Sequence, residues 1–426
     1  MIKKELKGLD IKVYEEQLDN GLKIFLVPLK NRKNYQINYF TKYGAAINEF
    51  ISLDDNKKVK VPYGVAHFLE HKMFEQESGE DPFSYFAKFG SDANAYTSYR
   101  VTAYIVEGSS EIEKNITYLL DYVNSPYFTD ENVEKEKGII IEEINMYKDE
   151  PEGKLYDESN KAVFQKHPCR VDVGGTPKSV RSITKEVLYK CYNTFYQPSN
   201  MYFVLVGNFD VKSVLKTIKN NKKLNNRESN MPITTIKVNE PKEVNTRSKE
   251  LNIKNIAIPK SILTFKTLLK SMSGEERFKY KMSVDILLYL LFGTSSPFRE
   301  DMLNKNLMTF LYSSKSIIDD IMLIELTSES KDPKKLFKEC MKRIKNIEIT
   351  KEDIERVKKV KIANEVYATD KVSMIMGMIN SYLVDQDEVI YNRIDLIKSI
   401  TLEDVLNVKK DIDLDNYSFV IGYPKE

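Results

Sequence analysis

YGVAHFLEHKMF, residues 63–74, is the stretch from which the fold and the chemistry of this chain are inferred. If the stretch is helical, His67 and His71 share one face because they are four residues apart, and Glu70 flanks the same face. The surrounding residues are almost all apolar, so this helix must be buried, and buried histidines need partners. We therefore predict that two imidazoles and one carboxylate point into the same cleft.

The motif reads H-x-x-E-H, the inverse of the H-E-x-x-H zinc helix and the signature of inverzincins. In such a site His67 and His71 each give a nitrogen to Zn²⁺, and Glu70 is the general base that takes a proton from the water on the metal. Two histidines in a buried helix are also compatible with core histidines that bind no metal. The composition favours the metal, because the 426-residue chain has three histidines and two of them lie here.

A catalytic zinc takes a third protein ligand, and a second helix-like run at residues 132–146 offers candidates for it. Glu136, Ile140 and Glu143 fall on one stripe of this helix, since seven residues are close to two turns. One carboxylate can then reach the metal while the other orients a ligand by hydrogen bonding. Glu142 lies about 100° round the helix from Glu143 and is expected to face elsewhere.

These features together resemble the pitrilysin/insulinase family of zinc peptidases, which includes the mitochondrial processing peptidase. In that family H-x-x-E-H is followed by a downstream helix whose glutamate completes the zinc site, and another glutamate precedes it by two turns. By position, the resemblance implies that Glu143 is the third ligand of one Zn²⁺ per chain. It also implies that Glu136 supports a ligand from behind.

The segment at residues 94–97 adds to the resemblance. Asn94, Ala95, Tyr96 and Thr97 match the family's N-A-x-T strand, which pairs with the substrate backbone beside the metal. We therefore predict that these four residues bind a peptide substrate. The resemblance covers nearly the whole chain and implies an α+β fold of two homologous domains. Each domain is expected to be a largely antiparallel sheet flanked by helices, and the two are expected to face each other across a peptide-binding cavity.

Local patterns predict the elements around the motif. Residues 21–28, 35–43 and 94–106 alternate between apolar and polar side chains and are predicted to be strands. Residues 82–89 and 110–124 have the spacing and the terminal signals of amphipathic helices. The predicted layout is helices packed against a largely antiparallel sheet.

An internal repeat predicts the domain organisation. Residues 183–207 and 400–422 each read as a capped helix followed by a strand that ends in glycine, and the two copies are offset by about half the chain. Residues 221–255 are rich in polar residues and are linker-like. We predict a zinc-bearing catalytic domain at residues 1–220 and a homologous, non-catalytic domain at residues 256–426.

The second half is expected to keep the fold without the chemistry, because it contains no histidine. In the family this half often offers an arginine and a tyrosine that grip the peptide after a G-x-S-S segment. Residues 293–296 read GTSS here, but the matching positions are Leu303 and Phe310, or Lys305 and Tyr312 after a two-residue shift. This departure resembles two-subunit members in which one protein carries zinc and its paralogue carries the Arg/Tyr pair. The resemblance thus implies a heterodimer with a paralogous partner, or a homodimer in which Lys305 and Tyr312 grip the peptide.

Composition and charge exclude several classes of function. Lys+Arg 65 against Asp+Glu 63 give a formal charge of +2, so neither a nucleic acid nor an anionic membrane is expected as a partner. The three cysteines are widely spaced and predict free buried thiols. The N-terminus lacks the apolar segment of a signal peptide and no long apolar run follows, so a cytoplasmic location is expected. His167 precedes a proline in a loop and is predicted to be no metal ligand.

The predicted function is that of a zinc-dependent endopeptidase acting on peptides or short unfolded segments, with Glu70 as the general base. The alternative is a non-catalytic assembly or binding subunit of a two-subunit peptidase complex. Such a subunit can lose any ligand, whereas His67, Glu70, His71 and Glu143 are all present. A zinc-stabilised structural domain is a third alternative, but structural sites usually contain cysteine, and no cysteine lies near the motif.

Overall fold

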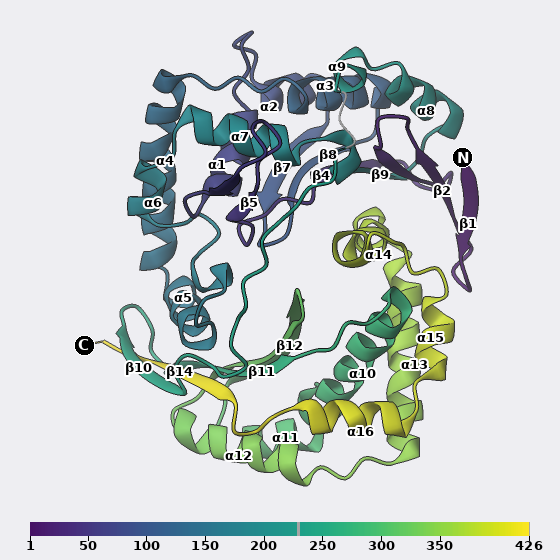
Figure 1. The fold of residues 1–426 in the computed structure, drawn as a ribbon. Helices are drawn as coiled ribbons and strands as arrows, with labels where there is room; N and C mark the ends of the chain where they lie inside the picture. Colours follow the sequence, from purple (N-terminus) through teal and green to yellow (C-terminus); the bar gives the residue numbers. More distant parts are fainter. Residues whose placement is uncertain (228–230, 426) are drawn as a thin grey trace. The chain divides into compact units, whose positions relative to one another are not determined.

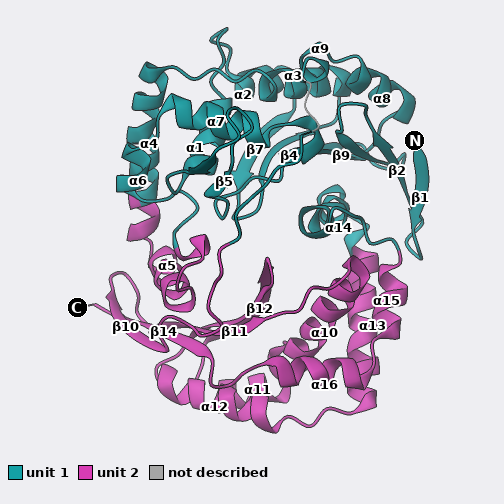
Figure 2. Cartoon of the chain, viewed as in Figure 1, with its two compact units in different colours: residues 1–144, 171–237, 368–391 teal, residues 145–170, 238–367, 392–426 magenta. Residues whose placement is uncertain are grey.

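The computed structural model describes residues 1–227 and 231–425, and their contacts divide the chain into two compact units (Figures 1 and 2). Unit 1 comprises residues 1–144, 171–237 and 368–391. Unit 2 comprises residues 145–170, 238–367 and 392–426. One segment from each half of the chain therefore packs in the other unit. The predicted domains, residues 1–220 and 256–426, are continuous in sequence, whereas the two units are defined by contacts and are discontinuous. The domain ranges therefore stay a prediction.

Unit 1 is built on a seven-stranded sheet in which β3 and β9 are parallel and all other neighbours are antiparallel. The central strands β4 and β9 are buried along their whole length, while β7 lies at the sheet edge and is partly exposed. The strand order is β1 (Ile2–Leu6), β2 (Ile11–Gln17), β3 (Lys23–Pro28), β9 (Met201–Gly207), β4 (Tyr35–Thr41), β8 (Thr102–Gly108) and β7 (Asp92–Thr97). A separate hairpin joins β5 (Glu49–Ile51) to β6 (Lys58–Lys60).

Helices cover both faces of this sheet, and the central strands β4 and β9 are therefore buried on both faces. One face carries the larger core, to which α1, α3 and α7 contribute Phe68, Leu119 and Phe195. On the other face Ile375 and Ile379 of α14 pack in a second core, so a late segment of the chain completes unit 1. The helices of unit 1 are α1 (Val65–Met73), α2 (Pro82–Ala87), α3 (Ile112–Val123), α4 (Asp130–Asp149, entering unit 2 at residue 145), α6 (Pro177–Arg181), α7 (Lys185–Phe195), the 3-10 turn η2 (Pro198–Asn200), α8 (Val211–Lys219), α9 (Lys222–Asn225) and α14 (Val372–Gln386).

Unit 2 is built on a five-stranded sheet in which β10 and β14 are parallel and the other neighbours are antiparallel. Its order is β10 (Ser248–Ile253), β14 (Tyr417–Pro424), β11 (Lys260–Leu268), β13 (Ile321–Glu329) and β12 (Phe310–Ile318). The main core lies on one face, and α5 packs on the other face against β14 and β11. The helices are α5 (Pro151–Val163), the 3-10 turn η1 (Pro168–Arg170), α10 (Gly274–Phe292), α11 (Pro297–Asn304), α12 (Pro333–Asn346), α13 (Lys351–Ala368, whose last residue belongs to unit 1), α15 (Arg393–Ser399) and α16 (Leu402–Asp411).

The two sheets confirm the internal repeat. Each contains one parallel pair followed by three antiparallel steps, so β3-β9-β4-β8-β7 corresponds to β10-β14-β11-β13-β12. The repeated helices α7 and α16 are both capped, by Thr184 and Thr401, and each leads into the strand of the parallel pair. Only the first of these strands ends at its glycine, Gly207, since β14 continues beyond Gly422 to Pro424. The mixed α and β fold with two similar parts is therefore as predicted.

Two predictions about local structure were wrong. Residues 94–106 are not one strand but parts of β7 and β8, joined by a turn at residues 98–101. Ser98 makes this turn, because its Oγ accepts hydrogen bonds from the backbone amides of Arg100 and Val101. The linker-like residues 221–255 contain α9 and also β10, which gains its structure by pairing with the distant strand β14.

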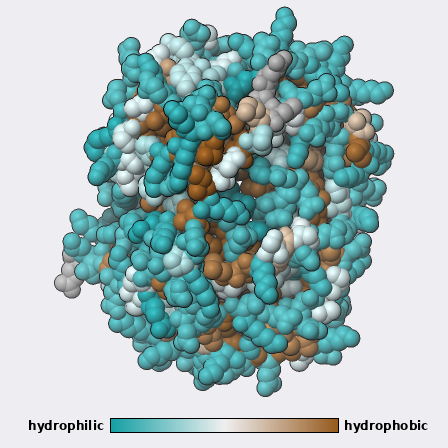
Figure 3. Space-filling view, in the orientation of Figure 1, coloured by the Kyte–Doolittle hydropathy of each residue, from teal (hydrophilic) through white to brown (hydrophobic). Residues whose placement is uncertain are grey.

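The surface is mostly polar where the structure is seen from one side. Figure 3 shows hydrophilic residues over most of this face, with hydrophobic residues gathered in patches between them. Within residues 1–227 and 231–425, no helix is both long enough and apolar enough to cross a membrane.

Candidate metal centre

The H-x-x-E-H residues lie on α1, which is buried in the core of unit 1. Val65, Phe68 and Leu69 anchor this helix, and the two histidines lie on its remaining, partly exposed face. The rings of His67 and His71 approach each other edge to face, with 4.6 Å between their centroids. The i, i+4 spacing therefore places the two imidazoles side by side, as predicted from the sequence.

Helix α4 brings a carboxylate to the two imidazoles. Glu143 Oε2 lies 3.4 Å from His71 Nε2 and 3.8 Å from His67 Nε2. One potential ligand atom from each of the three residues lies within 4.8 Å of the others. Residues 67, 71 and 143, from two helices far apart in sequence, thus gather into one cluster.

The donor set fits a zinc ion. A tetrahedral zinc with ligand bonds of about 2.0–2.2 Å separates its ligand atoms by about 3.4 Å. The distances of 3.4 and 3.8 Å from Glu143 to the two imidazoles match this requirement. Two histidines and one glutamate are also a typical set for a catalytic zinc, which keeps its fourth position open.

Glu136 fixes the orientation of His71. Glu136 lies on the same face of α4 as Glu143, two turns before it. Its Oε1 lies 3.0 Å from His71 Nδ1. This contact leaves Nε2 of the ring to face Glu143. A carboxylate that holds the far nitrogen of a metal-binding histidine sets its tautomer and raises its basicity, which is the role that the family resemblance implies for Glu136.

Lys72 forms an ion pair with Glu136, and the sequence analysis did not predict this contact. Its side chain is fully buried, and its Nζ lies 4.0 Å from Glu136 Oε2. The same ammonium is paired with Glu75 and donates to the backbone carbonyl of Asn132, 3.2 Å away at the start of α4. Lys72 therefore ties the two helices together. The available signal was a lysine in the middle of an otherwise apolar helix, where a buried charge needs a partner.

Glu70 faces the edge strand β7. Thr97 donates a hydrogen bond from its Oγ1 to Glu70 Oε2 over 2.6 Å. Of the four residues predicted to bind substrate, Thr97 is thus placed against a residue of the motif. Asn94 and Tyr96 are exposed and Ala95 is half-buried, all on the same edge strand.

Burial and charge set the protonation of these groups. Burial and the neighbouring His71 lower the pKa of His67 to about 4, so this imidazole is neutral at pH 7. Burial alone would lower the pKa of His71, but hydrogen bonds to Glu136 and Glu143 outweigh it and raise the pKa to about 9. A metal ion would displace the proton of His71, because only the neutral imidazole has a lone pair to give. Burial raises the pKa of Glu70, which favours a proton-accepting role near neutral pH.

A glycine-rich loop closes one side of the cluster. Gly64 precedes α1 with φ 88°, and a Cβ there would lie 2.4 Å from the carbonyl oxygen of Gly174. Gly175 has φ 83°, and a Cβ there would lie 2.5 Å from the carbonyl oxygen of Tyr63. This approach brings Gly174 near Nδ1 of His67, a buried atom with no hydrogen-bond partner in the described part of the chain. Packing therefore orients His67, and the GG pair was the signal that sequence reasoning passed over.

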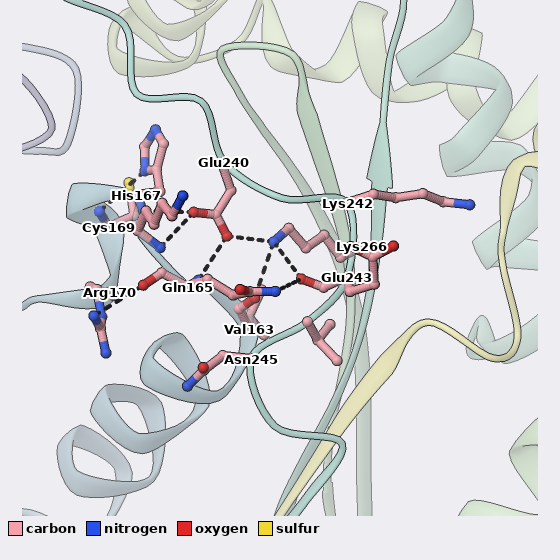
Figure 4. A network of polar contacts seen from close by, with 12 residues as sticks. Val163, Gln165, His167, Cys169, Arg170, Glu240, Lys242, Glu243, Asn245 and Lys266 are labelled. Carbon is pink, nitrogen blue, oxygen red and sulfur yellow. Dashed lines mark hydrogen bonds and ion pairs between the residues drawn. The ribbon is translucent and has the colours of Figure 1, made fainter.

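The third histidine and the cysteines lie outside this cluster. His167 belongs to unit 2, where its ring contacts Asp319. Its backbone amide donates a hydrogen bond to Glu240, as Figure 4 shows. It is no member of the metal-ligand cluster of residues 67, 71 and 143, and it is buried. The three cysteines are free and buried, which confirms that prediction.

A two-unit α and β protein whose first unit holds two histidines and a glutamate around H-x-x-E-H has the architecture of an inverzincin. Comparison with known families agrees. Residues 52–176 match the family described as insulinase (peptidase family M16), and residues 182–361 match the one described as peptidase M16 inactive domain. The chain belongs to peptidase family M16, the pitrilysin family.

Individual relatives agree with this assignment. The chain is 35% identical over 426 residues to a Bacillus subtilis protein named uncharacterized zinc protease YmfH, covering 99% of each. The crystal structure of an M16-like peptidase from Alicyclobacillus acidocaldarius matches with a TM-score of 0.93 and 29% identity, over 99% of this chain and 100% of that one. A protease from Helicobacter pylori has the same fold, with a TM-score of 0.84, 20% identity and coverage of 97% and 100%.

Proposed function

We propose that this chain is a zinc-dependent endopeptidase that hydrolyses peptides or short unfolded segments. The observation that carries the proposal is the cluster of His67, His71 and Glu143, whose spacing suits one zinc ion, beside the carboxylate of Glu70. Membership in a peptidase family whose relatives are named zinc proteases supports it. In this proposal the three clustered residues hold the metal.

Glu70 would move the proton. Thr97 holds its Oε2 by a hydrogen bond, which orients the carboxylate so that it can take a proton from the attacking water and later give it to the leaving amine. A bound zinc ion would polarise the scissile carbonyl and lower the pKa of the attacking water. Glu136 would keep His71 in place throughout, with Lys72 behind it.

The edge strand β7 would hold the peptide. Its neighbour β8 pairs with it on one side only, so the other edge has backbone groups that an extended peptide can pair with. Asn94, Ala95 and Tyr96 precede Thr97 on this strand, so a peptide added there would run past Glu70. Backbone pairing fixes the register of a peptide without selecting its sequence.

The second half of the chain lacks the arginine and tyrosine with which relatives are expected to grip a peptide, and this suggests a partner subunit. Leu303 and Phe310 are exposed, and neither can donate a hydrogen bond to a peptide carbonyl. Lys305 is engaged with Asp301 at 2.6 Å, while Tyr312 is exposed on β12. We therefore propose a paralogous partner that supplies an Arg/Tyr pair, with a homodimer using Lys305 and Tyr312 as the second possibility. Rates of peptide cleavage, measured with the chain alone and after mixing with such a partner, test this assembly.

Glu70→Gln is the experiment that separates a peptidase from a non-catalytic subunit. The amide keeps the shape of the side chain but cannot accept the proton, so zinc content should stay near one per chain and turnover should be lost. His71→Ala is the matched variant that should lose zinc as well. Cleavage by metal-loaded Glu70→Gln at the wild-type rate would refute the role of Glu70. Full zinc occupancy in His71→Ala would refute the metal site.

A further inference from the structure

Unit 2 carries a row of polar side chains across one face of its sheet. Glu325 on β13 is paired with Ser314 of the edge strand β12 on one side and with Thr264 of β11 on the other. Thr264 is in turn paired with Ser418 of β14. Directly paired residues project from the same face, with Cβ atoms about 4.5–5.5 Å apart. One carboxylate and three hydroxyls therefore lie side by side.

This row lies on the face opposite the main core. Ile324 and Leu326, which flank Glu325 on β13, point into that core, so Glu325 points away from it. Helix α5 packs over β11 and β14 on the side of the row, and there Thr264 and Ser418 are fully buried. The other end of the row, at β13 and β12, is only half-buried. The row thus leads from a covered interior to an accessible edge strand.

The polar atoms of the row lack partners of their own. The side-chain oxygens of Thr264 and Ser418 are buried and form no hydrogen bond with any described residue, and the same holds for Ser159 on α5. Uncompensated burial of such groups costs free energy, so they are expected to meet a polar ligand or water. Three unpartnered hydroxyls in one unit, two of them in this row, set this face apart from an ordinary packed interface.

Glu325 has no compensating charge among residues 1–227 and 231–425. Burial raises the pKa of its carboxyl, and no charged neighbour counters that effect. Lys266, the lysine nearest along β11, is two residues from Thr264 and is held by Glu240 at 2.6 Å. Among the described residues no ion pair or side-chain hydrogen bond reaches the Glu325 carboxylate. A cationic ligand would supply the missing charge.

We propose that Glu325 anchors a subsite for a lysine or arginine side chain of a peptide, an inference that rests on the proposed peptidase function. A lysine ammonium has three donors, and at the accessible end of the row the two carboxylate oxygens of Glu325 and the hydroxyl of Ser314 provide three acceptors. Tyr312 lies on the same face of β12 and is 59% exposed, so its ring can cover the aliphatic stem or the charge of the bound side chain. The substrates favoured by this chain are therefore peptides with a basic residue.

Peptide binding in a Glu70→Gln background tests the subsite without turnover. Two fluorescent peptides, identical except for one lysine or its uncharged isostere norleucine, are titrated with the full chain and followed by anisotropy. The Glu70→Gln protein should bind the lysine peptide about 10-fold or more tightly than the norleucine peptide, as expected for a hydrogen-bonded charge. Adding Glu325→Gln should bring this ratio to about one. Glu352→Gln removes the same charge from the exposed surface of α13 and should leave the ratio unchanged.

Three results would overturn the proposal. The first is equal binding of both peptides by the Glu70→Gln protein. The second is a preference for the lysine peptide that persists after Glu325→Gln is added. The third is loss of the lysine preference in millimolar Ca²⁺ at constant ionic strength, which would indicate a metal site instead. Glutamine keeps the shape of Glu325, so thermal unfolding should show an intact fold. If it does not, Ser314→Ala takes its place, with a smaller loss of the lysine preference expected and no loss refuting the subsite. Failure of the wild-type chain to cleave any peptide, both alone and mixed with the paralogous partner, would refute the peptidase function and leave the binding ratio as a separate result.

Discussion

The buried ion pair of Lys266 and Glu240 gives the sharpest stability prediction. Lys266 Nζ lies 2.6 Å from Glu240 Oε1, and the two side chains are 0% and 2% exposed (Figure 4). Neutralising one partner of such a pair leaves the other charge buried and uncompensated, which costs about 3–5 kcal/mol. We therefore expect Glu240→Gln to lower the free energy of unfolding of unit 2 by about 3–5 kcal/mol.

Removing the lysine should cost less than removing the acid. Without Lys266, the Glu240 carboxylate still accepts three backbone hydrogen bonds of 2.7 Å, from the amides of residues 165, 166 and 167. Without the Glu240 charge, the ammonium keeps the carbonyl oxygens of Val163 and Glu243, at 3.3 and 3.2 Å, and the face of the Phe164 ring, none of which carries a formal negative charge. Lys266→Met retains most of the apolar stem, so we expect a loss of about 1.5–3 kcal/mol. The double variant should cost less than the sum of the two, because it leaves no unpaired charge.

Equilibrium unfolding in urea measures these differences. The chain has 26 tyrosines and no tryptophan, so far-ultraviolet circular dichroism and tyrosine fluorescence are suitable probes. Where the two units unfold in separate steps, the transition of unit 2 is the one to compare. A larger loss from Lys266→Met than from Glu240→Gln, or strict additivity in the double variant, would refute the reasoning.

Three further outcomes follow from the contacts. Glu136→Gln should lower zinc affinity about 10- to 100-fold, because His71 loses the carboxylate on its Nδ1, and zinc titration against a competing chelator measures this. Thr97→Val should lower kcat about 10-fold through loss of the bond to Glu70, and unchanged zinc content would rule out a metal defect. Burial alone would raise the pKa of Glu240, but a lysine and three amides hold it below the ordinary 4.5. Its contribution to stability is therefore present above pH 4.5 and lost as the pH falls through the lowered pKa, so Glu240→Gln should flatten the acid limb of the stability profile.

The members of the candidate metal cluster could be predicted from the sequence, because the spacing within each helix sets which side chains share a face and the family resemblance implied that Glu143 joins the two histidines. The four-residue step from His67 to His71 and the seven-residue step from Glu136 to Glu143 place each pair on one face whatever the surrounding fold. A residue that acts across elements leaves a weaker signal. Lys72 has no pattern that predicts its contact with the helix of Glu136, since that contact exists only once the two helices are packed.

Turns and long-range pairing were decided by tertiary structure. Residues 94–106 keep their alternating pattern through the turn at Ser98, so the pattern alone predicts one strand where the structure has two. Strand β10 has polar and exposed residues and reads as linker, and it becomes a strand by pairing with β14. Such a strand is stabilised by hydrogen bonds to a partner that is distant in sequence, and these cannot be predicted from the sequence of the strand itself.

The sequence by itself determined the composition of each sheet face and the spacing of the candidate zinc ligands within each helix, because these depend on periodicities of two to seven residues. It also contained the repeat, as two similar segments offset by about half the chain. Only the tertiary structure decided that α14 covers the sheet of unit 1 and α5 the sheet of unit 2. It also placed Glu325 in a row with Ser314 and Thr264. The physical reason is that the hydrophobic effect is non-directional. The apolar face of an amphipathic helix indicates that this face is buried, but only the packing of the whole chain decides which sheet covers it.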